Sequence, residues 1–221
     1  MFGREAVFRL SQDDKARIPN GITTVNKQAP LLMRWEPDYR CRLPDHDFVV
    51  APSHKLISSV YAGLRFESEE DLSYSGPTFI AIRSAKHDSS TAQTHCTDFE
   101  ELIELEEFSS LAKHQDGRVK PIVIITVDGS PDENPRFPNV IAANAYLFKK
   151  YDLDVLFVAT NAPGRSAFNE VERRMAPLSK DLAGHIFAHD HYGNYLYDSE
   201  VQHELKSFLL PTIKMLCCAW F

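Results

Sequence analysis

A short apolar segment that ends abruptly on an acid constrains the fold of this chain most. Six apolar or β-branched residues run from Ile122 to Val127, and Asp128 and Gly129 follow directly. A run of this length without alternation is typical of a strand in a parallel sheet, where helices cover both faces. The sequence therefore predicts an α/β fold with Asp128 at the carboxyl end of a central strand, which is the edge where such sheets place their ligands.

Helical periodicity lies on both sides of this strand. The segments predicted from it are a helix within 89–114 capped by Ser89 or Ser90, a helix over 138–150, an apolar strand over 153–160, a helix over 166–184, and a weaker helix over 200–216. Pro177 should kink or interrupt the helix over 166–184, because proline lacks the N–H that a helix interior needs. Strands that alternate with helices indicate parallel pairing in this part of the chain.

The first third of the chain carries a different pattern. A strand over 5–12 and a returning strand over 22–33 are predicted to form a wide hairpin, because Pro19, Asn20 and Gly21 between them are turn residues. Further strands are predicted over 55–66 and 77–84. Antiparallel strands followed by parallel strand–helix units are the order of a ribonuclease H-like mixed sheet, which is the fold class that we expect.

The placement of acids on this sheet suggests a site. Asp13 or Asp14 ends the predicted first strand, Asp128 ends the fourth, and Glu172 lies on the helix after the fifth. The first and fourth strands are neighbours in this order, so the three carboxylates can gather at one end. Each acid also has an ordinary interpretation, as a turn residue, a helix N-cap or half of an ion pair.

Three neighbouring carboxylates predict a metal site. They repel one another and stay ionised only if a cation neutralises them, and hard oxygen ligands favour Mg²⁺ or Mn²⁺. Two such ions can activate a water or a 3′-hydroxyl and stabilise the leaving oxygen of a phosphodiester. This is the chemistry of nucleases, transposases and integrases.

Three segments resemble mariner-like transposases of the Asp-Asp-Glu class. The segment "SAFNEVERRMAPLS" is similar to the part of that family that carries the third acid, "LSQDDKARIPNG" to its first-acid strand, and "IITVDGSPDENPR" to the part with its second. The resemblance implies that Asp13 is the first metal ligand, with Asp14 as the alternative register. Asp128 would be the second, with Asp132 as the fallback, and Glu172 the third.

Longer phrases resemble a group of transposon-derived proteins over about residues 5–198. They include "GPTFIAIRSAKHDSSTAQTH" and "TNAPGRSAFNEVERRMAPLS". The chain departs from the mariner-like pattern at Glu170, where that family has proline, and in a longer interval between the second and third acids. The resemblance implies a transposase core over 1–198 and a divergent, helical tail over 199–221.

The resemblance also implies that the partner is DNA at transposon ends. Transposases carry a basic helix-turn-helix region before the catalytic fold, whereas this chain starts almost at its first strand and has a net charge of −7. We therefore expect a fragment or a degenerate copy without its DNA-binding region, which could form homo-oligomers. Lys15, Arg165, Arg173 and Arg174 are the candidates for phosphate contacts.

Other features exclude several classes of protein. No run is long and apolar enough for a membrane span, and no secretory signal begins the chain, so an intracellular protein is expected, nuclear if functional. The four cysteines have neither zinc-ligand nor disulfide spacing. The cluster of His185, His189, Asp190 and His191 has no second set of ligands, so zinc catalysis is disfavoured.

Two hypotheses for the function follow. In the first, the chain is a metal-dependent polynucleotidyl transferase that cleaves DNA strands with Asp13, Asp128 and Glu172. In the second, it is a catalytically inactive or domesticated transposase remnant that acts as an interaction domain. The intact acid trio favours the first hypothesis, and the missing basic region favours the second.

Overall fold

A computed structural model describes residues 3–19, 32–36, 39–42, 55–66, 75–162, 164–165 and 168–182. Several predicted features lie outside these residues. They are most of the returning strand over 22–33, the cluster at 185–191, the helix over 200–216 and the tail over 199–221.

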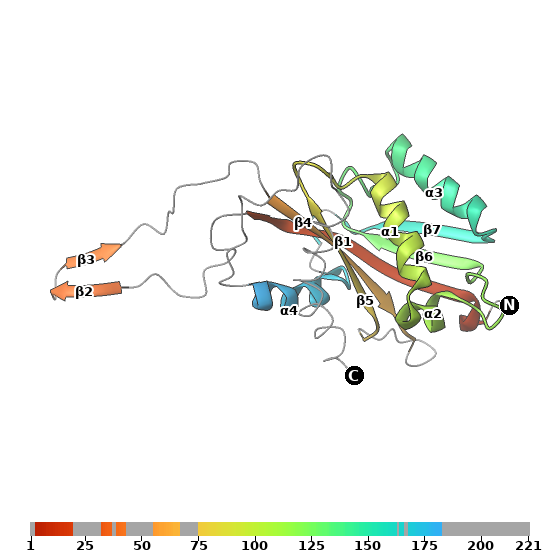
Figure 1. Cartoon of the computed structure of the whole chain (residues 1–221), viewed down its shortest axis with the longest axis horizontal. Coiled ribbons are helices and arrows are strands. Elements are labelled where there is room, and N and C mark those ends of the chain that lie inside the picture. The colour runs from red at the N-terminus through yellow and green to blue at the C-terminus, as the bar shows by residue number, and fades with distance from the viewer. Residues whose placement is uncertain are drawn as a thin grey trace, which may run out of the picture.

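A mixed five-stranded sheet forms the centre of the molecule, in the order β5-β4-β1-β6-β7 (Figure 1). Its strands are β1 (Val7–Pro19), β4 (Lys55–Leu64), β5 (Thr78–Ser84), β6 (Ile122–Val127) and β7 (Val155–Thr160). β1 pairs antiparallel with β4 and parallel with β6; β4–β5 is antiparallel and β6–β7 is parallel. This is the ribonuclease H-like order predicted from the sequence. A separate two-stranded sheet consists of β2 (Leu32–Glu36) and β3 (Tyr39–Arg42).

The prediction of a hairpin over 5–33 was wrong in its described part. β1 does not end before Asp13 but continues to Pro19, and its antiparallel partner is β4, with Asp13 opposite Val60 and Asp14 opposite Ser59. Leu32 pairs with β3 instead. Because successive side chains of a strand point to opposite faces, Asp13 and Asp14 are directed to opposite sides of the sheet.

The helices differ from the predicted ones at their ends. A 3-10 turn, η1 (Arg4–Ala6), precedes β1. The predicted helix within 89–114 is two helices, α1 (Ala92–Glu104) and α2 (Glu106–Ala112), because Leu105 between them is extended. Thr91, rather than Ser89 or Ser90, caps α1 through a capping box with Thr94.

The later helices follow the prediction more closely. α3 (Pro138–Lys150) has the predicted bounds, with proline at its first position. α4 (Glu172–Leu182) begins later than predicted and continues through Pro177. None of the described helices has the length and apolar character needed to span a bilayer.

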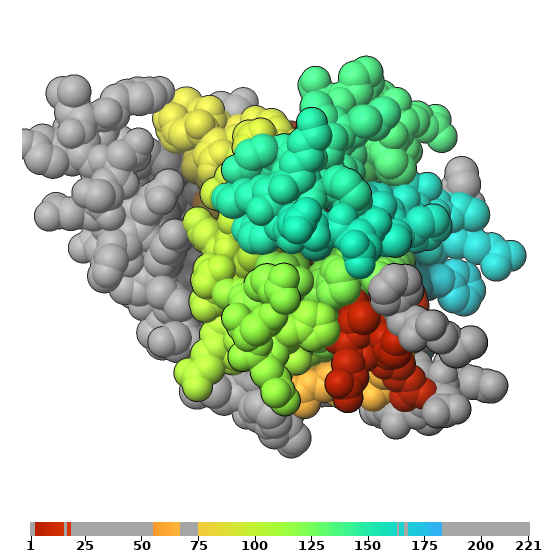
Figure 2. All heavy atoms as spheres, turned by 90° about the vertical axis from the view of Figure 1, so that its right-hand side faces the viewer, coloured from red at the N-terminus to blue at the C-terminus, as the bar shows by residue number. Residues whose placement is uncertain are grey.

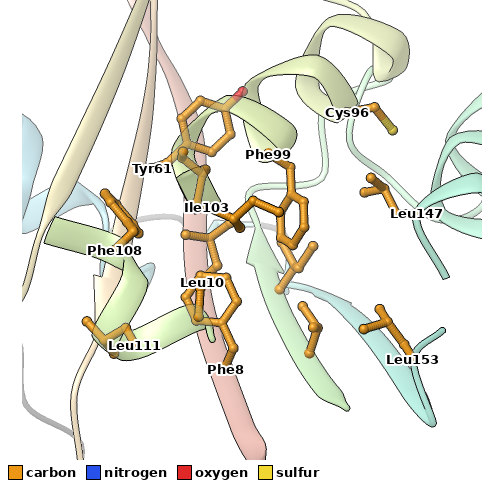
Figure 3. Close-up of a cluster of buried hydrophobic side chains, with 14 of the residues drawn as sticks. Phe8, Leu10, Tyr61, Cys96, Phe99, Ile103, Phe108, Leu111, Leu147 and Leu153 are labelled. Carbon is orange, nitrogen blue, oxygen red and sulfur yellow. The ribbon is translucent and has the colours of Figure 1, made fainter. Parts of the chain in front are cut away.

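Apolar clusters lie on both faces of the sheet. α1, α2 and α3 cover one face, where Phe8, Leu10, Tyr61 and Phe99 are buried together (Figure 3). α4 lies on the opposite face, where Met175, Leu178 and Leu182 of this helix and Val171 just before it pack against residues of β1 and β4. Figure 2 shows that segments far apart in sequence, from the N-terminal residues in red to later ones in blue, contribute to one face of the molecule.

The α4 face is covered only in part. On β6 the side chains on the α1 side, such as Val123 and Val127, are buried, and the alternating ones are half-buried. On β7, Phe157 is 58% exposed. The prediction that the central strand is fully buried on both faces was therefore wrong for the described residues.

Candidate functional site

Asp13 lies inside β1, on the face that α4 covers. Ser11 and Lys15, two residues before and after it, contact Asn169 and Ser179 on this face. Asp13 is only 8% exposed. The strand therefore holds this carboxyl group rigidly and largely away from water.

Asp128 directly follows the last residue of β6, on the face to which Asp13 is directed. Alternation along β6 gives this direction, because the buried Val127 belongs to the α1-side core. Gly129 has a φ of 97°, which a residue with a Cβ adopts only with strain. Thr160 and Asn134 lie near the position that its Cβ would take. The chain thus turns sharply as soon as Asp128 is in place.

Glu172 is the first residue of α4, and the segment before it is fixed to β1. The Ser11 hydroxyl donates to Asn169 Oδ1 at 2.5 Å and accepts from the Val171 backbone N–H at 3.1 Å. Asn169 Nδ2 donates to the Gln12 carbonyl at 3.2 Å. These bonds are buried, and they position Glu172 relative to the strand that carries Asp13.

The three acids interact electrostatically. The pKa of Asp13 is raised to about 7, first by burial and then by the negative charges of Asp128 and Glu172. Lys15 lies close enough to both Glu172 and Asp13 that their charges raise its pKa, but burial outweighs them and the pKa of Lys15 is lowered overall. The site therefore concentrates negative charge around a buried carboxyl group.

Asp14 and Asp132, the two acids predicted as alternative ligands, lie close to each other and to His95. Among the residues that the structure describes, one group of three has ligand atoms that all lie within 4.8 Å of one another, and it consists of Asp14, His95 and Asp132. The carboxylate oxygens of Asp13, Asp128 and Glu172 do not all lie within this distance of one another. Like charges repel, so a cation would have to draw the three together.

The donor set of Asp13, Asp128 and Glu172 fits a hard divalent cation. All the groups are carboxylates, which suit Mg²⁺ or Mn²⁺ better than softer metals. A cation would also offset the repulsion that raises the pKa of Asp13. The chemistry of the residues is thus compatible with the metal expected from the sequence.

The predicted phosphate-contacting residues have different surroundings. The Lys15 ammonium donates to Ser179 on α4. Arg174 donates to the Gly76 carbonyl at 2.7 Å and to the Thr78 hydroxyl at 3.2 Å, so it joins α4 to β5. Arg173 is exposed, and the exposed Arg165 lies over the Phe168 ring at 5.7 Å.

Glu170, which replaces the proline of the mariner-like pattern, has a clear structural partner. Its carboxylate pairs with Arg9 of β1 at 2.8 Å and accepts a hydrogen bond from Thr126 of β6 at 3.3 Å. Glu170 thus provides a second polar contact between the segment before α4 and the sheet, in addition to the hydrogen bonds of Asn169.

The sequence did not point to two buried polar residues that lie next to Asp132, namely His95 and Glu133. Glu133 is 2% exposed and His95 7% exposed. No short motif contains both, because they come from α1 and from the loop after β6.

Three crystal structures of mariner transposase complexes are similar to this chain. They are the Mos1 mariner paired end complex with Mn (15% identity, TM-score 0.49), the Mos1 strand transfer complex (13%, 0.45) and a pre-cleavage Mos1 transpososome (13%, 0.49). They cover 90%, 90% and 93% of this chain, which spans only 47%, 46% and 48% of theirs.

Searches by sequence found no counterpart. No family model matches the chain, and no curated protein matches it. The sheet order is that of the ribonuclease H-like fold predicted from the sequence.

Proposed function

We propose that this chain is a transposase-derived catalytic core that cleaves or joins DNA strands in a metal-dependent reaction. The observation that carries the proposal is that three carboxylates from separate parts of the chain lie close enough for their charges to interact. Asp128 and Glu172 both act on the buried Asp13, and all three belong to the α4 face of one sheet. Acids of this kind gather at functional sites, where burial and like charges perturb their pKa values.

In this proposal Asp13, Asp128 and Glu172 hold two Mg²⁺ or Mn²⁺ ions. Bound there, the ions would activate a water or a 3′-hydroxyl and stabilise the leaving oxygen of a phosphodiester. The chain itself supplies a rigid first ligand in β1, a second at the end of β6, and a third positioned by Asn169. The core would extend over 1–198.

DNA is the proposed substrate and the nucleus the proposed location. The exposed Arg165 and Arg173 are the better candidates for phosphate contacts, because Lys15 and Arg174 are half-buried. With a net charge of −7, the chain would bind DNA weakly by itself and require a basic partner or region.

The test is nicking of supercoiled DNA by the purified chain in Mn²⁺ or Mg²⁺. Nicking should depend on the metal and be lost in Asp128→Asn, which keeps the size of the side chain but removes its charge. Asp152→Asn makes the same change at an exposed turn and should leave nicking intact. Equal nicking by the wild type and Asp128→Asn would refute the assignment of Asp128.

The second candidate function is an inactive remnant that serves as an interaction domain. It is favoured by the separation of the three carboxylates, which do not form a group as tight as that of Asp14, His95 and Asp132. An inactive chain would show no metal-dependent nicking at all, even though circular dichroism shows it to be folded.

A further inference from the structure

A second polar cluster lies on the face of the sheet opposite to the proposed catalytic site. Asp14 of β1, His95 of α1 and Asp132 of the loop after β6 place their ligand atoms within 4.8 Å of one another. His95 is buried, and the Asp132 side chain is 20% exposed, which leaves a way in from solvent. Three segments distant in sequence thus meet at one point.

Glu133 supplies an independent sign that this cluster binds a ligand. Its side chain is fully buried, and its Oε2 has no hydrogen-bond partner, although most buried polar atoms have one. Its Oε1 accepts from Gln12 at 3.4 Å and lies 3.8 Å from His95 Nε2. A buried carboxylate oxygen without a donor is costly unless it meets a proton or a cation.

The space beside Glu133 can hold an ion. Glu133, His95, Asp132 and Gln12 lie at the polar part of a cavity of about 30 Å³ whose other lining residues are mostly apolar, and this volume is room for a small ion or a water.

Contacts with neighbouring side chains hold the ring of His95 in place. The Tyr61 hydroxyl, at the tip of the ring in Figure 3, donates to Asp98, so its oxygen can accept from His95 Nδ1–H at 2.6 Å. With the proton on Nδ1, the lone pair of Nε2 would repel Asp132 Oδ2, 3.4 Å away, unless a cation or a proton lies between them. Histidines that bind metals typically donate their other N–H in this way.

The same network reaches Asp14. Arg83 donates to Asp98 and, at 2.7 Å, to the Ser59 hydroxyl, which in turn donates to Asp14 Oδ1 at 2.5 Å. Ser130 donates to Asp132 Oδ1 at 2.6 Å, which leaves Oδ2 toward His95. Ser90 Oγ also lies 3.0 Å from His95 Nε2, so a cation would displace that contact.

We propose that Asp14, His95 Nε2, Asp132 and Glu133 form a binding site for a divalent transition-metal cation such as Zn²⁺. One imidazole among carboxylates favours this class over Mg²⁺. The cation would join the loop after β6 to β1 and α1, so the site is structural. The proposal does not depend on DNA cleavage, because none of its four ligands belongs to the proposed catalytic trio.

The test is Zn²⁺ binding by the full chain after treatment with EDTA. Isothermal titration with Zn²⁺, and absorption spectroscopy with Co²⁺ in its place, should reveal one site. His95→Gln and Asp132→Asn should each weaken metal binding by more than about tenfold, because loss of an outer-shell partner alone already costs about that much. His114→Gln changes an exposed histidine that follows α2 and should leave binding unchanged. Mg²⁺ should not compete at equal concentration.

Two results would overturn the proposal. One is unchanged Zn²⁺ affinity in both Asp132→Asn and His95→Gln, which would place any bound zinc at other histidines of the chain. The other is the absence of Zn²⁺ binding by the wild type. Asp132→Asn keeps the contacts of His95 with Tyr61, so it remains informative if His95→Gln does not fold, which circular dichroism in EDTA would reveal.

Discussion

Asp13 is the residue at which burial and repulsion oppose ionisation in the proposed catalytic site. Its pKa is raised to about 7 from the ordinary value of 3.8. Between these two values the unfolded chain has released the proton of Asp13 while the folded chain still holds it. Asp13 therefore contributes most to stability below about pH 3.8, and this contribution is lost as the pH rises toward 7.

Replacing Asp13 by asparagine should remove this pH dependence. The stability of Asp13→Asn relative to the wild type should increase from pH 5 to pH 8 by up to about 1.4 kcal/mol per pH unit within the window. Urea denaturation in EDTA at the two pH values measures it. Asp152→Asn, at an exposed turn, should show no such trend, and a constant difference for Asp13→Asn would contradict a raised pKa.

At the scale of elements, Asn169 fixes the start of α4 to β1. It is 1% exposed and bonds to the Ser11 hydroxyl and to the Gln12 carbonyl. Asn169→Ala leaves the Ser11 hydroxyl without its acceptor and removes a donor from the Gln12 carbonyl, which should cost about 1–3 kcal/mol of stability. Because Glu172 then loses its position relative to Asp13, nicking should fall more than the fraction of folded protein does.

The matched control is Asn139→Ala, at an exposed position near the start of α3. It should change stability by less than about 0.5 kcal/mol, with nicking unchanged. If Asn169→Ala lost stability and nicked DNA at the wild-type rate, Asn169 would have no positioning role.

Elements with local signals could be predicted from the sequence, and those that depend on distant partners could not. The apolar runs gave β6 and β7, and the acids on this pattern led to Asp13, Asp128 and Glu172. The extension of β1 through Asp14 depends on pairing with β4. The role of His95 depends on Tyr61 and Asp132, which no local periodicity connects to it.

At the scale of the whole molecule, the sheet separates two apolar cores. Leu147 of α3 belongs to the cluster around Phe8 and Phe99, and Leu178 of α4 belongs to the cluster on the other face. Each is a leucine that is almost fully buried, with 3% and 5% of its surface exposed. The proposed catalytic site lies on the α4 side, and the proposed zinc site on the other.

This separation predicts that a substitution in one core destabilises the helices on that face of the sheet without opening the other face. Leu178→Ala and Leu147→Ala should each cost about 2–5 kcal/mol, because each leaves a cavity in its core. Local opening often follows such structural units, so hydrogen exchange should rise mainly in α4 for Leu178→Ala and in α3 for Leu147→Ala. Nicking should suffer more from Leu178→Ala, and Zn²⁺ affinity more from Leu147→Ala, since Leu147 lines the cavity beside Glu133. Equal increases in exchange on both faces for both variants would show instead that the sheet and its two cores open as one cooperative unit.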